Sequence, residues 1–471
     1  MSYKRIALLI TLTLSVVTQT ASAEKDSLLA DRIEAGDRKA ALELLSQTMD
    51  VNAAQADGST PLHWAVYRVY EDLVKTLLAR GAKADVSNTY GSSPLSEAAR
   101  AANIHMVRML LDAGADANRA NQDGQTPLML AARTGVVSVA EALVSHGANV
   151  NAREQSRKQT PLMWAAAEGH PEMVAFLISR GAEVNARAEA NDWGNQMTSE
   201  PRVQYRPAGG LTPLLYAARG GCRPCIDALL QGGADIDRPN PDGMTPLMMA
   251  IDNAHYEAAK DLLDRGANPH TWDWWGRTPI YIAINMRAGA DSRPGPRPPE
   301  SMALIRALLD QGVDTNHQLN MLQPSRSGNS GRFKDDLLNT GATPLLRAAQ
   351  TFDNEVVQLL LEHGALVDLP NAMGVTPLMA AAGIGTRPAE SVLGPGPPPD
   401  VVERSIETMT ILLAAGADVN ARVTDTTSLT ARIARPSTMT NREGQTALRF
   451  ASEMGRTAVV NFLREHGADP K

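Results

Sequence analysis

The stretch Thr126-Pro127-Leu128-Met129-Leu130-Ala131-Ala132 decides the fold of this chain, because its first three residues recur throughout the sequence. Thr-Pro-Leu begins at residues 60, 126, 160, 212, 245, 343 and 376, and variants of it begin at Ser93, Thr278 and Thr446. The interval between starts is the same from 60 to 93, from 93 to 126, from 212 to 245, from 245 to 278 and from 343 to 376. A constant step that resumes after each longer interval indicates a structural repeat with insertions.

Each copy of the tripeptide predicts the start of a helix. The threonine hydroxyl can accept a hydrogen bond from a free backbone N–H of the first turn. Proline suits the first helical position, where a missing N–H costs nothing. About ten residues later an apolar run such as 107–111 predicts a second helix, and Gly114-Ala115 marks its end. Glycine is favoured there because it adopts the left-handed backbone that closes a helix.

The chain resembles the ankyrin-repeat family, in which Thr-Pro-Leu-His-x-Ala recurs with a period of about 33 residues. Thr60-Pro61-Leu62-His63-Trp64-Ala65 matches this signature. The resemblance implies an all-α repeat solenoid in which each unit is a helix-turn-helix followed by a β-hairpin finger. It also implies a binding scaffold with protein partners and no enzymatic activity, and it implies no cofactor.

The repeat period divides the chain into about eleven units after residue 23, within a single ankyrin-repeat domain over 24–471. A first, degenerate unit is expected near Ser27. The units start near residues 27, 60, 93, 126, 160, 212, 245, 278, 343, 376 and 446. Five insertions interrupt them, at 187–210, 287–300, 317–341, 386–400 and 422–440. The insertions at 287–300 and 386–400 are rich in proline and glycine, which argues against helix or central strand. They are interpreted either as tolerated surface loops or as part of a docking surface.

The segment 1–23 has the pattern of a cleaved signal peptide. Lys4 and Arg5 precede an apolar run over 6–17, and Ala21-Ser22-Ala23 fits a cleavage site. The run is shorter than the roughly 20 apolar residues that a membrane span needs. The sequence therefore predicts a periplasmic or secreted protein with no membrane span after cleavage.

The formal net charge is −7, from 45 basic and 52 acidic residues. This balance argues against nucleic acid as the main partner, because phosphate binding needs a basic surface. The sequence also contains no phosphate-binding loop, no nucleophile elbow and no zinc-protease motif. We therefore expect neither catalytic residues nor a metal site.

Cys222 and Cys225 are the two cysteines of the chain, and the repeat places them at the start of a second helix. In an oxidising compartment a disulfide is expected. A Cys-x-x-Cys pair at a helix N-terminus also allows redox activity. The alternatives to a binding scaffold are accordingly a periplasmic redox or stress-protection factor using this pair, or a secreted effector that binds host proteins.

Two sets of residues are candidates for partner binding. Trp272, Trp274 and Trp275 lie on one finger, where exposed tryptophan is expected to serve recognition unless the rings pack on a neighbour. Tyr90 lies at the tip of another finger. The second set follows the Ala-rich turn of the first helices, on the expected concave face. It comprises Tyr67, Arg68, Arg100, Arg133, Asp252 and Asn253. By contrast, Trp64 and Trp164 are expected in the core.

Overall fold

A computed structural model describes residues 27–47, 49–192, 207–288, 297–320, 341–384, 399–424 and 443–470. The expected signal peptide and most of the five insertions lie outside these residues. The described chain divides into two compact bodies, which we treat separately. The N-terminal body comprises Met1–Glu189, Thr212–Ala217 and Pro224–Ala234; the C-terminal body comprises Ala190–Leu211, Ala218–Arg223 and Asp235–Lys471.

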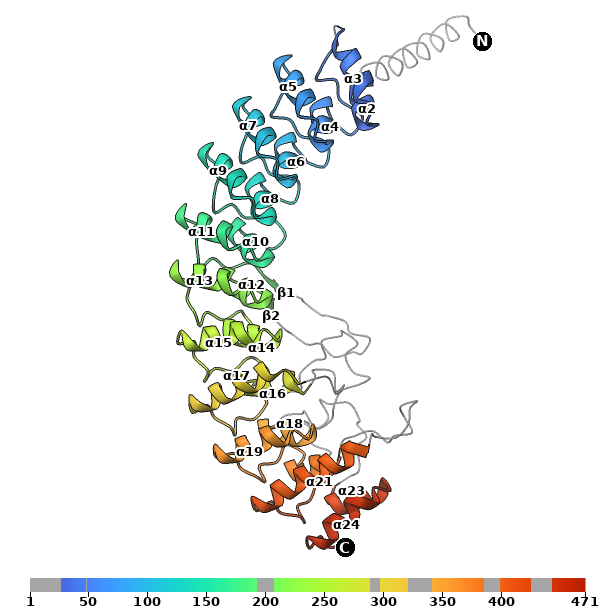
Figure 1. The fold of residues 1–471 in the computed structure, drawn as a ribbon, viewed down its shortest axis with the longest axis vertical. Helices are drawn as coiled ribbons and strands as arrows, with labels where there is room; N and C mark the ends of the chain where they lie inside the picture. Colours follow the sequence, from blue (N-terminus) through green and yellow to red (C-terminus); the bar gives the residue numbers. More distant parts are fainter. Residues whose placement is uncertain are drawn as a thin grey trace, which may run out of the picture. The chain divides into compact units, whose positions relative to one another are not determined.

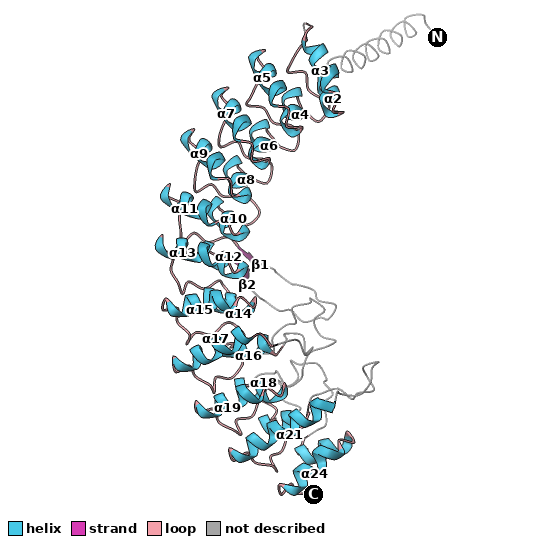
Figure 2. Ribbon diagram, viewed as in Figure 1, coloured by secondary structure: helices cyan, strands magenta, loops and turns pink. Residues whose placement is uncertain are grey.

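The described residues fold as helix pairs, as Figures 1 and 2 show. The first helix of each pair is α2 (Leu28–Glu34), α4 (Pro61–Tyr67), α6 (Pro94–Arg100), α8 (Pro127–Thr134), α10 (Pro161–Glu168), α12 (Pro213–Gly220), α14 (Pro246–Asp252), α16 (Pro279–Arg287), α18 (Pro344–Gln350), α20 (Pro377–Ala381) or α23 (Ala447–Glu453). The second is α3 (Arg38–Leu45), α5 (Glu71–Ala79), α7 (Ile104–Asp112), α9 (Val137–Ser145), α11 (Pro171–Ser179), α13 (Arg223–Gln231), α15 (Tyr256–Asp264), α17 (Pro299–Asp310), α19 (Asn354–Glu362), α21 (Pro399–Ala414) or α24 (Thr457–Glu465). The expected all-α repeat solenoid is confirmed.

The first helices begin as the tripeptide predicts. The hydroxyl of Thr343, for example, accepts from the backbone N–H of Leu346 at 3.1 Å, and Pro344 is the first helical residue. At the far end of a helix pair, Gly114 has φ of 89°, which a residue with a side chain adopts only at a cost. Small side chains let the helices approach closely, and Ala65, Ala98 and Ala131 are fully buried.

Within each body the helices form two layers. In the N-terminal body α4, α6, α8 and α10 lie side by side, and α5, α7, α9 and α11 form the second layer (Figure 1). In the C-terminal body α14, α16, α18 and α20 make one layer and α15, α17, α19 and α21 the other. Apolar residues fill the space between layers, so each pair is stabilised mainly by its immediate neighbours.

A ladder of asparagine side chains joins successive repeats where the second helices end. The Nδ2 of Asn118 donates to the carbonyl of Gly147 at 2.8 Å, and its Oδ1 accepts from the backbone N–H of Asn149 at 2.7 Å. Equivalent pairs of bonds are made by Asn52, Asn151, Asn316 and Asn420. Each asparagine therefore satisfies one carbonyl and one amide of the following repeat.

A second ladder runs along the fingers, made of backbone hydrogen bonds. The N–H of Gln155 donates to the carbonyl of Asp123 at 2.7 Å, and the N–H of Trp274 donates to that of Asp242 at 2.8 Å. The expected β-hairpin character appears as strands at one described finger, where β1 (Ala190–Asp192) pairs antiparallel with β2 (Pro207–Gly209). The other described fingers are turns without regular strand pairing (Figure 2).

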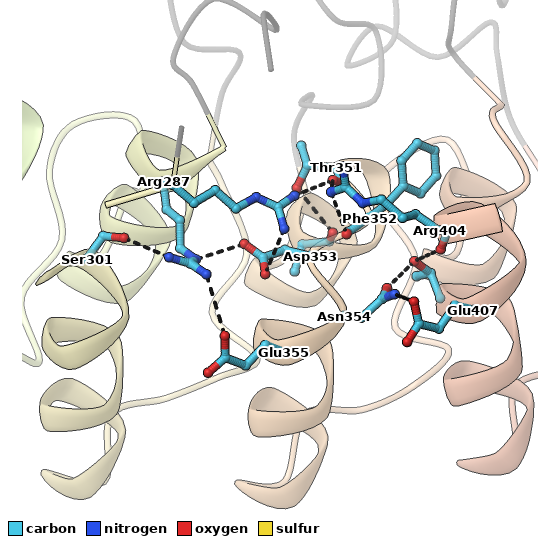
Figure 3. A network of polar contacts seen from close by, with 12 residues as sticks. Arg287, Ser301, Thr351, Phe352, Asp353, Asn354, Glu355, Arg404 and Glu407 are labelled. Atoms are coloured by element: carbon cyan, nitrogen blue, oxygen red, sulfur yellow. Dashed lines mark hydrogen bonds and ion pairs between the residues drawn. The ribbon is translucent and has the colours of Figure 1, made fainter. Parts of the chain in front are cut away.

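Arginine side chains clamp one turn in the C-terminal body (Figure 3). Buried Arg287 donates through Nε to buried Asp353 at 2.9 Å and through Nη1 to Ser301 at 3.0 Å. Arg297 and Arg404 both donate to the carbonyl of Thr351, at 2.8 and 3.3 Å. The clamp joins three consecutive repeats, because these groups belong to the pairs α16–α17, α18–α19 and α20–α21.

Candidate protein-binding surface

Three predicted residues occupy one position in consecutive repeats of the N-terminal body. Tyr67, Arg100 and Arg133 each lie seven residues after the capping threonine or serine, on the adjacent helices α4, α6 and α8. All three side chains are exposed: Tyr67 to 54%, Arg100 to 56% and Arg133 to 63%. The repeat period therefore places an exposed tyrosine and two exposed arginines in line.

An aromatic ring lies close to the guanidinium group of each of the two arginines. The guanidinium of Arg100 is 6.0 Å from the centre of the Tyr67 ring, and that of Arg133 is 5.9 Å from the centre of the Trp164 ring. Trp64 contacts Tyr67 edge to face at 5.7 Å. These distances are those of cation–π and aromatic contacts. We call Trp64, Tyr67, Arg100, Arg133 and Trp164 the first-helix row.

The expectation that Trp64 and Trp164 lie in the core is wrong, because both are only half-buried. Each lies four residues after its capping threonine, on the same side of the first helix as the residue at position seven. The indole N–H of Trp64 donates to Gln55 at 2.6 Å, whereas that of Trp164 is buried with no acceptor among the described residues. The helical spacing of three between the two positions is the signal that could have revealed both tryptophans.

Each arginine near the row has an internal partner. Arg100 donates through Nε to Glu97 at 3.0 Å, and the Nε of Arg133 lies 3.4 Å from Glu168. Predicted Arg68 is exposed and donates to the carbonyl of Glu34. Glu97 is only 21% exposed, so at this pair the cation faces the solvent.

In the tryptophan-bearing finger of the C-terminal body, only two of the three rings are exposed as expected. Trp272 and Trp274 are exposed to 57% and 48%, but Trp275 is 5% exposed. The prediction that all three rings are exposed is therefore wrong for Trp275. The next finger packs against this position, since the N–H of Asn320 donates to the carbonyl of Trp275 at 2.9 Å.

A buried ionic group holds this finger in shape. Asp273 accepts from the backbone N–H of Trp275 at 3.0 Å and from the Nε of Arg277 at 2.7 Å. Arg277 also donates to Asp252 at 3.0 Å. Burial raises the pKa of Asp273, although Arg277 and the backbone N–H groups oppose the rise. The group fixes the backbone between the exposed rings of Trp272 and Trp274.

Asp252 and Asn253 were expected to be available to a partner, but both are half-buried and bonded internally. Asp252 pairs with Arg277, and the Nδ2 of Asn253 donates to the carbonyl of Met249 at 2.8 Å. Tyr90 is 68% exposed at its fingertip, with no close partner on the first-helix row described above. Within the N-terminal body, the structure thus groups Tyr67, Arg100 and Arg133, and Arg68 directly follows Tyr67 in the chain.

Cys222 and Cys225 form a disulfide at the start of α13, and Cys225 is fully buried. Among the described residues no cluster of histidine, cysteine and acidic side chains could hold a metal ion. In the same part of the chain, every helix is too short or too polar to cross a membrane.

Family comparisons agree with this architecture. Profiles described as ankyrin repeats in three copies match residues 29–121, 95–188, 195–273 and 214–292. A single-repeat profile of the same family matches 340–372 and 443–471. Together these matches cover more than half of the chain. The chain belongs to the ankyrin-repeat family.

Several known proteins are similar to this chain over part of their length. Human inversin is 30% identical over 190 residues, which are 40% of this chain and 15% of inversin. Human B-cell lymphoma 3 protein is 30% identical over 177 residues, 36% of this chain and 33% of that protein. The putative ankyrin repeat protein FPV031 of fowlpox virus is 29% identical over 164 residues, 35% of this chain and 40% of that protein. The similarity spans less than half of each relative. Ankyrin repeats, to which the matched profiles belong, generally mediate protein–protein interaction.

Proposed function

We propose that this chain is an exported, non-enzymatic scaffold that binds a protein partner through the first-helix row. The observation that carries the proposal is the set of exposed aromatic and cationic side chains on adjacent helices. Tyrosine, tryptophan and arginine are the residues that contribute most to protein interfaces. Because the two ladders fix the repeats, little ordering would accompany binding.

The finger that carries Trp272 and Trp274 is a second proposed contact for a protein partner. Its support is the exposure of two large rings together with the buried ionic group beneath them, which holds the backbone in one conformation. Exposed apolar rings of this size favour an interaction site. This contact is proposed independently of the first-helix row, since the two lie in different bodies.

Export is proposed from the sequence of the segment 1–23. The disulfide between Cys222 and Cys225 supports it, since disulfides persist in oxidising compartments. A redox role gains no support from the family, because ankyrin repeats generally mediate protein–protein interaction. Fractionation of the producing cells, with N-terminal sequencing of the mature protein, tests the proposal: a chain that begins at Glu24 supports it, and a cytoplasmic chain that retains Met1 refutes it.

Affinity capture from the producing cells tests the binding proposal. The test variant carries Tyr67→Ala, Arg100→Ala and Arg133→Ala, which remove the exposed members of the row. The matched control carries Arg108→Ala and Arg180→Ala, which remove one exposed arginine from α7 and one from the C-cap of α11. We expect a protein captured by the wild type and by the control to be lost with the test variant. Identical capture by all three proteins would refute this use of the row.

A further inference from the structure

We propose that the first-helix row recognises an acidic, extended segment of its partner protein, with carboxylates spaced three residues apart. This inference rests on the proposed use of the row in binding and adds the chemistry of what it binds. Three observations support it: the accessibility of the two cations of the row, the aromatic rings beside them, and their spacing.

The first-helix row contains two cations, Arg100 and Arg133, and no carboxylate, although the whole chain has a formal charge of −7. Arg100 pairs with Glu97 and Arg133 with Glu168, whereas Arg68 donates to the backbone carbonyl of Glu34. Glu97 is the less exposed member of its pair and also accepts from the hydroxyl of Ser92 at 2.7 Å. Its charge is therefore partly satisfied within the repeat, and the guanidinium of Arg100 remains the accessible group.

The guanidinium groups of Arg100 and Arg133 lie over the aromatic rings of Tyr67 and Trp164. A guanidinium that lies on a ring has fewer conformations to lose when it binds, and it keeps N–H donors at its edge. Those edge donors match the paired oxygens of a carboxylate. Within the described part of the chain, the ionic partner of Arg133 is Glu168, and the 3.4 Å separation leaves this pair easy to exchange for another carboxylate.

The separation between Arg100 and Arg133 fits an extended partner segment better than a helical one. Arg100 and Arg133 occupy equivalent positions on the adjacent helices α6 and α8, and packed helices lie roughly 8–10 Å apart. Three residues of polyproline II chain rise about 9 Å, so carboxylates at positions i and i+3 match this separation. Neighbouring same-face residues of a helix lie only about 5–6 Å apart. A partner segment of the form Glu-x-x-Glu in extended conformation therefore places one carboxylate on each arginine.

Fluorescence polarisation on the full chain tests the inference. The probe is a fluorescein-labelled peptide, Gly-Glu-Pro-Pro-Glu-Pro-Pro-Glu-Gly-amide, whose prolines favour the extended conformation. The control peptide has glutamine in place of each glutamate. We expect binding of the acidic peptide that weakens with added salt, and roughly tenfold or more weaker binding of the glutamine peptide, since close charge pairs contribute at this level.

Substitutions of the two arginines test whether the peptide binds at the first-helix row. Arg100→Gln with Arg133→Gln should weaken acidic-peptide binding about tenfold, and the corresponding double lysine variant should retain more affinity, since it keeps the charge. The matched control is Arg180→Gln, because Arg180 also lies over a ring, 5.1 Å from the centre of Phe176, but at the C-cap of a second helix. That variant should bind within twofold of wild type.

Two results would overturn the acidic chemistry: equal affinity for the glutamine peptide, or a loss below threefold in the double glutamine variant. Its failure is distinguishable from failure of the proposed function. If a cellular partner is lost with Tyr67→Ala but captured normally by the double glutamine variant, the row binds a partner by other chemistry and the acidic assignment is wrong. If capture is unaffected by either change, the proposed function itself fails.

Discussion

Asp368 occupies a position of the side-chain ladder where several repeats have asparagine, as at Asn118 and Asn316, and others have aspartate, as at Asp85. We expect Asp368→Asn to stabilise the protein. One carboxylate oxygen of Asp368 accepts from the backbone N–H of Asp418 at 2.9 Å. The other is buried with no hydrogen-bond partner among the described residues. In the preceding repeat Asn316 makes both bonds, with its Nδ2 donating to the carbonyl of Gly364 at 3.0 Å. A carboxylate cannot supply this donor.

The expected gain at neutral pH is about 1 kcal/mol, the net contribution of one hydrogen bond. Burial raises the pKa of Asp368, and the neighbouring charge of Asp418 adds to the rise, while the N–H of Asp418 opposes it. A raised folded-state pKa means that the native state binds the proton more tightly than the unfolded chain does. The associated stability is present at low pH and is lost as the pH rises through the folded pKa. The advantage of asparagine should therefore be full at pH 7 and shrink as the pH falls through that pKa.

Native-state hydrogen exchange is the suitable assay, because repeat proteins open locally and a single unfolding midpoint can hide the change. Amides of α19 and α21 should exchange roughly fivefold more slowly in Asp368→Asn at pH 7. The matched control is Asn316→Asp, which should produce the opposite change of similar size. Faster or unchanged exchange in Asp368→Asn at pH 7 would refute the argument, as would an advantage that persists undiminished at pH 3.

Three further substitutions test other parts of the structure. Trp275→Ala should destabilise the finger by about 3–5 kcal/mol, whereas Trp272→Ala and Trp274→Ala should each cost less than about 0.5 kcal/mol in thermal unfolding; equal losses at all three positions would contradict the burial difference. Val69 has φ of 59° at an exposed turn, so Val69→Gly should raise stability by about 1 kcal/mol in urea unfolding, and a loss would show that the turn is not strained. Asp353→Ala removes the buried carboxylate that pairs with both Arg287 and Arg297, and leaves Arg287 only the half-exposed carboxylate of Glu355. It should cost about 3–5 kcal/mol, measured by exchange at the start of α19, and protection at the wild-type level there would exclude a stabilising clamp.

The fold could be predicted because the signals are local. A capping hydroxyl, a proline at the first helical position and a glycine at the helix end each act within a few residues, and Thr343, Pro344 and Gly114 do so as expected. Because the unit repeats, the same local signals mark the start and end of helix pairs along the chain. The clamp at Thr351 could not be predicted in this way, because Arg297 and Arg404 reach it from positions more than fifty residues away in the chain.

The candidate site was predicted less completely, because exposure depends on neighbouring repeats. Trp274 and Trp275 are adjacent and chemically identical, yet only the first is exposed, since the next finger packs against the second. Asp252 was expected at the surface because its spacing from the helix start matches that of Tyr67. Its arginine partner, Arg277, lies in the following finger, and no pattern within one repeat reveals this pairing.

The clamp around Thr351 has a consequence for how this chain can change over evolutionary time. Arg297 lies near the end of the proline-rich stretch 287–300, Arg404 follows the stretch 386–400, and both donate to the same carbonyl. Because each arginine lies at or after the end of its stretch, we expect that residues gained or lost earlier in the stretch would leave the register of the following helices unchanged. Insertions and deletions should therefore be tolerated better there than within the helices.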